Sequence, residues 1–248
     1  MRHNPAYVKA FAESLPSSYR SAFDWAATAE HAATSQRRRP GLPGVGICFA
    51  PRFPGHAVCV VADDRPGLLA TISAALISER LDVIAAEAYT RRLSAEGREA
   101  VDIFWVKLLD GADPERPLSK ELLDHLETTL GQLLTGNYDP HSARIPTQPP
   151  PARTSEVSET VVRFIEDRGG MLSTLEVETS DRRGLLLVLA RSLYEQKVQI
   201  VSSSVRTENG RVKDRFEVTE LDDTPIRPER RLLVQVAVLN AVQETFGR

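Results

Sequence analysis

An internal repeat constrains this chain more than any other feature, because two similar stretches of sequence fold into two similar structural units. At an offset of 117 residues, residues 64–69 (DRPGLL) align with residues 181–186 (DRRGLL). The alignment continues through an apolar helical stretch and the strand-like stretch that follows it. Residues 102–106 (DIFWV) then match residues 214–218 (DRFEV) at an offset of 112, so the intervening hairpin is five residues longer in the first copy. We therefore predict two copies of one module.

Each copy has the residue pattern of a strand, a helix, two strands and a second helix. The predicted strands are 57–61, 82–92 and 99–108 in the first copy and 174–178, 198–207 and 211–219 in the second. Asn209-Gly210 favours a tight hairpin turn. Asp64 and Asp181 are predicted to cap the helices that follow them. The apolar residues expected on the buried face of the last helix are Leu232, Leu233, Val236, Leu239, Val242 and Phe246.

A four-stranded ferredoxin-like sheet needs one more strand than each copy supplies. Strand-like stretches at 45–49 and 160–165 precede the two copies, and each is followed by turn residues. A strand joined to the next one by a hairpin can complete the same sheet, which gives a permuted β-βαββα unit. Alternatively, each of these strands completes the sheet of the other copy. The predicted fold class is α+β, with two four-stranded antiparallel sheets and two helices on each.

The remaining sequence divides the chain into four parts. Residues 1–40 are predicted to be a helical arm, with helices at about 5–14 and 24–37. The first module occupies 41–134 and the second 159–248. Between them, 135–158 is rich in proline, a composition that resists regular structure and is typical of a linker.

Composition excludes several classes of partner. The net charge of -3 provides no field that would attract nucleic acid or an anionic membrane. The run Arg37 to Arg39 is interpreted as a solvated helix end. Cys48 and Cys59 are expected to be small core residues with reduced thiols, not a disulfide. No apolar stretch is long enough to span a bilayer and no signal peptide is recognisable, so we expect a cytoplasmic protein.

The order of strand, DRPGLL turn, helix and DIFWV strand resembles an ACT domain, and the closest resemblance is to the tandem ACT tail of bacterial PII uridylyltransferases. It covers roughly residues 45–248. In that family the paired ACT domains sense glutamine and regulate catalytic domains that precede them, and the helical arm resembles the connector before the tail. The resemblance implies amino-acid sensing, allosteric regulation and a place in nitrogen metabolism.

The resemblance also implies a ligand site at the turn before the first helix of each module. A glycine lets a ligand approach the backbone, and helix N-terminal N–H groups can receive a carboxylate. The site residues carried over are Asp64, Arg65, Pro66, Gly67 and Leu68 in the first copy and Asp181, Arg182, Gly184 and Leu185 in the second. Arg183 replaces the expected proline. Under the alternative interpretation, the aspartate caps the helix, the glycine permits the turn and nothing binds.

We find no sequence pattern for catalysis, a cofactor or a metal site, and the five histidines lack metal-ligand spacing. The leading hypothesis is a two-domain regulatory protein that binds an amino acid, for which the resemblance implies glutamine, and acts on a protein partner or on its own homodimer. Two alternatives stay open. The chain is the regulatory portion or a relative of a PII uridylyltransferase, or it is a dimerisation module without a ligand.

Overall fold

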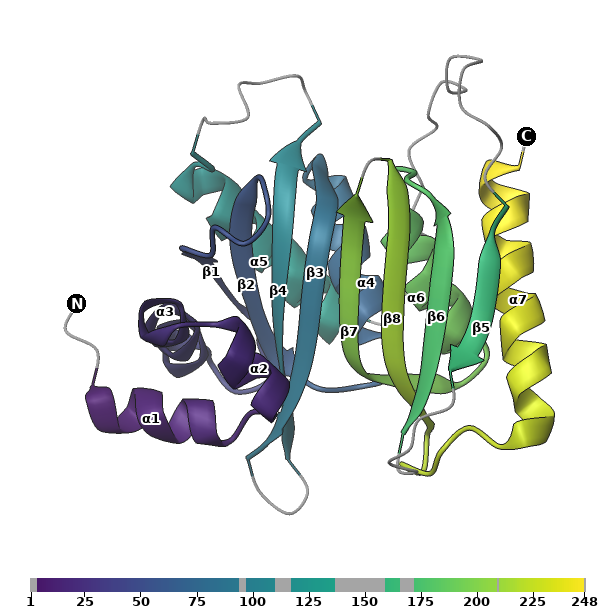
Figure 1. Cartoon of the computed structure of the whole chain (residues 1–248). Helices are drawn as coiled ribbons and strands as arrows, with labels where there is room; N and C mark the ends of the chain where they lie inside the picture. The colour runs from purple at the N-terminus through teal and green to yellow at the C-terminus, as the bar shows by residue number, and fades with distance from the viewer. Residues whose placement is uncertain are drawn as a thin grey trace. The chain divides into compact units, whose positions relative to one another are not determined.

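The computed structural model describes residues 4–93, 97–109, 117–136, 159–165, 172–208 and 210–247. The chain forms two compact units (Figure 1), of which unit 1 contains residues 1–64 and 79–138 and unit 2 contains 65–78 and 139–248. Most of the predicted linker, from residue 137 to 158, lies outside the described residues.

Unit 1 contains an antiparallel sheet in the order β1-β2-β4-β3. Its strands are β1 (Gly44–Cys48), β2 (His56–Asp63), β3 (Leu81–Arg92) and β4 (Arg98–Leu108). β1 pairs with β2 through a register in which Val45 faces Val60 and Ile47 faces Val58. The strand before the first copy therefore completes the sheet of its own copy, as the permuted arrangement requires.

Unit 2 repeats this topology in the order β5-β6-β8-β7. The strands are β5 (Val161–Ile165), β6 (Ser173–Ser180), β7 (Val198–Glu208) and β8 (Arg211–Glu220). A register shift follows Val83 in β3 and Ile200 in β7, which are equivalent positions of the repeat. The predicted α+β class and the permuted strand order are confirmed, and the alternative in which strands are exchanged is wrong.

The N-terminal helices pack on one face of the unit 1 sheet (Figure 1). They are α1 (Pro5–Glu13), α2 (Ser17–Ala22), which the sequence did not predict, and α3 (Trp25–Arg37). Their aromatic side chains meet aromatic side chains of the sheet: the Tyr19 and Tyr89 rings lie 5.3 Å apart, and Phe23 stacks on Trp105 at 6.3 Å. Cys59 lies in the same core. The arm is thus part of the hydrophobic core of unit 1.

The other helices are α4 (Leu68–Ser78), α5 (Lys120–Thr135), α6 (Leu185–Glu195) and α7 (Pro228–Phe246). α5 contacts β1 in unit 1. In unit 2, α4 and α7 both contact α6, although α4 belongs to the first repeat in sequence. None of the helices in the described part of the chain is long and apolar enough to cross a membrane.

The predicted buried face of α7 is wrong in part. Val234, Val238 and Val242 are the buried residues of this helix. Leu232, Leu233 and Val236, which we expected in the core, are 67%, 63% and 46% exposed. α7 has two apolar stripes, and helical periodicity alone does not determine which one faces β5.

Candidate functional site

The turns before α4 and α6 have the same backbone hydrogen bonds. The Asp64 N–H donates to the Arg98 carbonyl at 3.0 Å, and the Asp181 N–H donates to the Gly210 carbonyl at 2.9 Å. Leu68 donates to Arg65 at 3.1 Å, and the equivalent Leu185 donates to Arg182 at 3.0 Å. Gly67 and Gly184 both have a left-handed backbone, with φ of 79° and 77°. The repeat is therefore preserved at the atomic level in these turns.

The exposed part of each turn is its arginine-rich centre. Arg65, Pro66 and Arg183 are exposed, whereas the side chains of Leu68 and Leu185 are buried. A Cβ atom on Gly67 would lie 2.8 Å from the Tyr194 ring of α6. Tyr194 is thus a neighbour of the candidate site in unit 2 that sequence reasoning missed, because no local pattern connects positions 67 and 194.

The cap of α6 lies at a different residue from the one predicted. The N-cap residue of α6 is Gly184, which has no side chain to make a capping hydrogen bond, and not Asp181 as predicted. The Asp64 carboxylate receives a long hydrogen bond from Thr90 Oγ1 at 3.4 Å and lies 3.7 Å from Arg98 Nε. Asp64 is therefore held by the ends of β3 and β4.

A second aspartate is buried near each turn. Burial, and then the neighbouring charge of Asp64, raise the pKa of Asp102 well above its usual range. Burial likewise raises the pKa of Asp214, and the charge of Asp181 adds to the shift. Neither carboxyl oxygen of Asp214 has a hydrogen-bond partner of normal geometry. Each repeat therefore combines a turn aspartate with a buried strand aspartate whose pKa is raised by burial.

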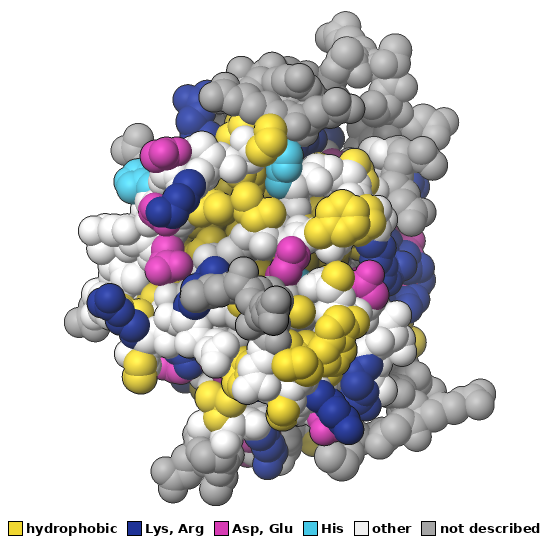
Figure 2. All heavy atoms as spheres, turned by 90° about the vertical axis from the view of Figure 1, so that its left-hand side faces the viewer, with side chains coloured by type: hydrophobic (Ala, Val, Ile, Leu, Met, Phe, Trp, Pro, Cys, Tyr) yellow, Lys and Arg dark blue, Asp and Glu magenta, His cyan; other side chains and the backbone are white. Residues whose placement is uncertain are grey.

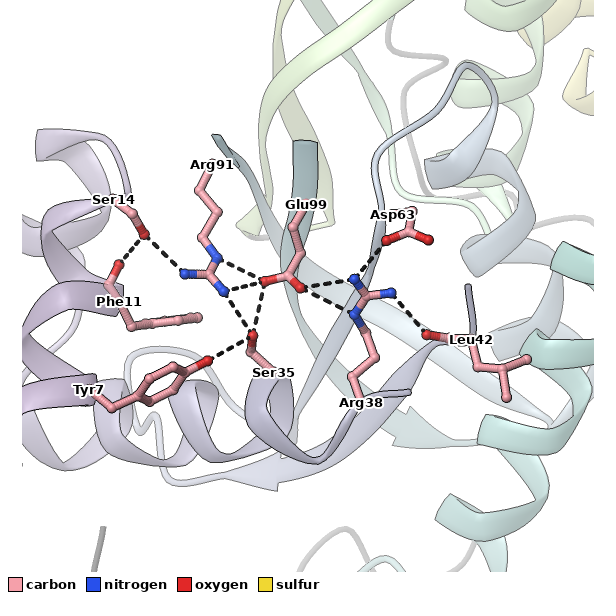
Figure 3. Close-up of polar contacts among 9 residues, drawn as sticks. All are labelled: Tyr7, Phe11, Ser14, Ser35, Arg38, Leu42, Asp63, Arg91 and Glu99. Carbon is pink, nitrogen blue, oxygen red and sulfur yellow. Dashed lines mark hydrogen bonds and ion pairs between the residues drawn. The ribbon is translucent and has the colours of Figure 1, made fainter. Parts of the chain in front are cut away.

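A buried ion cluster connects the arm to the sheet of unit 1 beside the first turn (Figure 3). The Glu99 side chain is 3% exposed and accepts hydrogen bonds from Arg91 Nε at 2.8 Å, Arg38 Nε at 3.1 Å and Ser35 Oγ at 3.0 Å. Arg91 also donates to Ser14 Oγ at 3.1 Å, and its guanidinium lies 4.5 Å from the centroid of the Phe11 ring. We call Glu99, Arg91 and Arg38 the arm clamp.

The arm clamp lies next to the first turn along the chain. Arg38 Nη2 donates to Asp63 Oδ1 at 2.6 Å, and Asp63 directly precedes Asp64. Arg98, whose carbonyl receives the Asp64 N–H, directly precedes Glu99. A displacement of Asp64 would therefore act directly on Asp63, which binds Arg38 of the arm clamp, and on Arg98, the neighbour of Glu99.

Sequence reasoning missed the arm clamp. The Arg37 to Arg39 run was interpreted as a solvated helix end, but the Arg38 side chain is only 8% exposed and forms two ion pairs. The second repeat lacks the equivalent charges. Arg91 faces Glu99 across the β3–β4 pair, whereas the register of β7 and β8 sets Glu208 opposite Arg211. The reversed order of charges in the two hairpins was therefore a sequence signal that the first hairpin differs from the second at this position.

The described residues contain no cluster of histidine, cysteine, aspartate and glutamate that could hold a metal ion. Cys48 and Cys59 are buried free thiols, and burial raises the pKa of Cys48 to about 12. Burial lowers the pKa of His31 to about 4, and its Nδ1 lies 2.7 Å from the Tyr19 hydroxyl. These side chains belong to the core.

Comparison with curated proteins finds bifunctional uridylyltransferase/uridylyl-removing enzymes among the relatives. The chain is 30% identical over 232 residues to the bifunctional uridylyltransferase/uridylyl-removing enzyme of Rhodospirillum rubrum. The aligned region covers 91% of this chain and 24% of that enzyme. The enzyme of the same name from Phenylobacterium zucineum is 27% identical, over 89% of this chain and 23% of its own length. In Caulobacter vibrioides the identity is 26%, over 96% of this chain and 25% of the enzyme. No protein-family model matches the chain.

The comparisons confirm the predicted resemblance to uridylyltransferases. The similarity extends over both repeats and the arm, since it covers about nine tenths of the chain. The chain spans about a quarter of the length of these relatives.

Proposed function

We propose that this chain is an amino-acid-binding regulatory unit with two ACT-like domains. It is similar to a segment that makes up about one quarter of the length of the bifunctional uridylyltransferases. The observation that carries the proposal is the repeated turn: both copies hold a left-handed glycine at a helix start, with matching backbone hydrogen bonds, beside a pair of aspartates. A free amino acid has charges that suit such a turn. Helix N-terminal N–H groups attract its carboxylate, and the turn aspartate attracts its ammonium group.

The first turn is the better candidate for ligand binding. It retains the full Asp-Arg-Pro-Gly sequence, whereas Arg183 interrupts the second. It also adjoins the arm clamp through Asp63 and Glu99. A ligand that draws Asp64 toward its ammonium group changes the position of both neighbours, so binding is coupled to the way the arm packs on unit 1. Such coupling requires different ligand affinities in the two arm arrangements.

Glutamine is the proposed ligand because the resemblance to the PII uridylyltransferase tail implies it. The test is thermal unfolding with glutamine, glutamate and a panel of other free amino acids. A ligand that binds only the folded chain raises its stability, by about 2.7 kcal/mol at a concentration one hundred times the dissociation constant. We expect glutamine to raise the melting temperature and glutamate to have a smaller effect.

Matched variants localise the ligand. Asp64→Asn keeps the shape of the side chain but removes the charge that attracts an ammonium group, so we expect at least a tenfold loss of glutamine affinity. Asp181→Asn makes the same change in the second turn and should have the smaller effect. If no amino acid stabilises the chain, the dimerisation module without a ligand becomes the better hypothesis.

The enzymatic alternative has its own assay. We expect these 248 residues to show no uridylyl transfer to PII, because the proposed role is regulatory. Turnover by the isolated chain would overturn the proposal. The proposed setting of this regulation is the cytoplasm.

A further inference from the structure

β1 forms an open edge of the unit 1 sheet. Among the strands of the described residues it pairs with β2 alone, through the register from Gly44 to Cys48. Backbone N–H groups of alternate residues in an edge strand point away from the sheet. The Val45 N–H donates to Glu127 Oε2 at 2.9 Å, and the Phe49 N–H donates to Glu30 Oε2 at 2.6 Å. Ile47, halfway between them, therefore also directs its backbone outward.

The side chains beside this edge are unusually apolar for a surface. Phe49 is 70% exposed and Ile47 is 45% exposed. Figure 2, which faces this side of the molecule, shows hydrophobic side chains gathered in several groups among both cationic and anionic ones. Exposed aromatic side chains next to an unpaired strand edge are typical of interaction surfaces.

A hollow of about 670 Å³ adjoins the N-terminal half of β1. Its apolar lining includes Leu42, Pro43, Val45 and Leu123, and its rim includes Arg37 of α3. Gly44 and Gly46 permit α3 to approach the strand closely, since a Cβ on Gly46 would lie 2.5 Å from Thr34 Oγ1. The hollow is therefore at one end of β1, and the exposed Phe49 is just beyond the other.

From this geometry we infer that β1 pairs antiparallel with β1 of a second copy of the chain, about a two-fold axis at Ile47. In that register Ile47 faces Ile47 of the second copy and Phe49 faces Val45, so every outward backbone group finds a partner. Facing residues of an antiparallel pair direct their side chains to the same face of the sheet. Each Phe49 ring consequently enters the apolar hollow beside Val45 of the other copy.

The charges at the edge are self-complementary under the same symmetry. Glu30 adjoins the C-terminal end of β1 and Arg37 the N-terminal end, and both belong to α3. The two-fold axis sets Glu30 of one copy near Arg37 of the other. Among the described residues Arg37 has no carboxylate partner, and its only side-chain hydrogen bond is to Thr34 at 3.4 Å. In the separate chain Glu30 and Glu127 occupy the places of the missing strand's carbonyl groups and compete with the second copy.

Analytical ultracentrifugation of the full chain across the micromolar range tests the inference. We expect a concentration-dependent dimer that Phe49→Ala weakens roughly 30-fold, as for a central aromatic anchor. Leu93→Ala removes another apolar side chain of unit 1, 51% exposed, and should leave the dimer unchanged. Glu127→Ala should strengthen the dimer, because the carboxylate no longer occupies the Val45 N–H. A wild-type chain that stays monomeric, or equal effects of Phe49→Ala and Leu93→Ala, would overturn the inference.

Cysteine cross-linking tests the register. Facing Cα atoms in a hydrogen-bonded antiparallel pair lie about 5.5 Å apart, within disulfide range. Ile47→Cys should therefore form a covalent dimer under mild oxidation, and the wild type, whose two thiols are buried, should not. Phe49→Cys is the matched control: its side chain is more exposed, but it faces Val45 and not its own copy. Cross-linking of Phe49→Cys as fast as Ile47→Cys contradicts the proposed pairing. Neither experiment depends on amino-acid binding.

Discussion

Gly67 determines the shape of the first turn in two ways. Its φ of 79° lies in the left-handed region, where a side chain costs about 1 to 2 kcal/mol. In addition, a Cβ atom would lie 2.8 Å from the ring of Tyr194. Other residues can adopt this backbone conformation with strain, but their Cβ atom would clash with the Tyr194 ring where it lies. The turn is therefore sensitive to substitution even when nothing is bound.

We predict that Gly67→Ala lowers the free energy of unfolding by about 2 to 3 kcal/mol, because the steric clash adds to the backbone cost. Gly210→Ala is the matched control, since Gly210 has φ of 74° and a Cβ there would contact nothing within 4 Å. It should show the backbone cost alone. The measurement is urea unfolding of both variants and of Gly67→Ala with Tyr194→Ala.

In the double variant, the excess cost of Gly67→Ala over Gly210→Ala should disappear once the separate effect of Tyr194→Ala is subtracted. If the excess cost remains, Tyr194 is not its cause. The glycine requirement was predictable from the sequence, because a tight turn between strand and helix selects glycine. The identity of its neighbour was not, because it depends on how α4 and α6 pack.

At the scale of elements, the arm clamp joins α1 and α3 to the ends of β3 and β4. Two buried guanidinium groups share the single carboxylate of Glu99, and Arg38 has a further partner in Asp63. Removing one member of a buried ion cluster leaves the others without charge compensation, which costs far more than losing a surface ion pair.

We predict that Glu99→Gln destabilises the chain by about 3 kcal/mol and loosens the arm. Hydrogen exchange should increase most at backbone amides of α1 and α3, because these helices lose their charged contact with the sheet. Glu13→Gln is the control: Glu13 is 64% exposed in a surface pair with Lys9, so its replacement should change stability by less than about 0.5 kcal/mol. Uniform exchange in Glu99→Gln would mean that the clamp supports the whole unit and not the arm in particular.

Sequence patterns located several strands closely. The predicted 82–92 and 211–219 correspond to Leu81–Arg92 and Arg211–Glu220, because alternation and hairpin turns are local signals. The predicted buried face of α7 was wrong in part, since both of its stripes are apolar and only tertiary packing selects Val234 and Val238. Burial of Arg38 was missed for the same reason, because its partners are 25 and 61 residues away in sequence.

At the scale of the whole molecule, the repeat gives each unit one buried aspartate at the same place. The pKa values of the two carboxyl groups are shifted in the same direction. The pKa values of Asp102 and Asp214 are raised well above the ordinary range, mainly by burial. A carboxyl whose pKa is higher in the folded chain than in the unfolded chain stabilises the fold at low pH. That stabilisation is lost as the pH rises from about 4 through the folded-state pKa.

We therefore predict that Asp102→Asn and Asp214→Asn each become more stable relative to the wild type as the pH rises from 5 upward. The difference should grow by about 1.4 kcal/mol per pH unit until the folded-state pKa is reached, since asparagine does not titrate. The measurement is urea unfolding of wild type and variants at several pH values. Each variant must be compared with the wild type at the same pH, because His31 also makes the free energy of unfolding depend on pH. The pKa of His31 is lowered to about 4, so its contribution increases with pH below 6.5, opposite to that of the aspartates.

Asp222→Asn is the control for this series. Asp222 is exposed, and hydrogen bonds from Thr224 lower the pKa of its carboxyl, so its contribution to stability is complete well below pH 5. Its difference curve should be flat where those of the other two variants rise. A flat curve for Asp102→Asn or Asp214→Asn as well would show that the carboxyl of that repeat is ionised in the folded chain, and the paired-aspartate arrangement beside the turn would then be wrong for that copy.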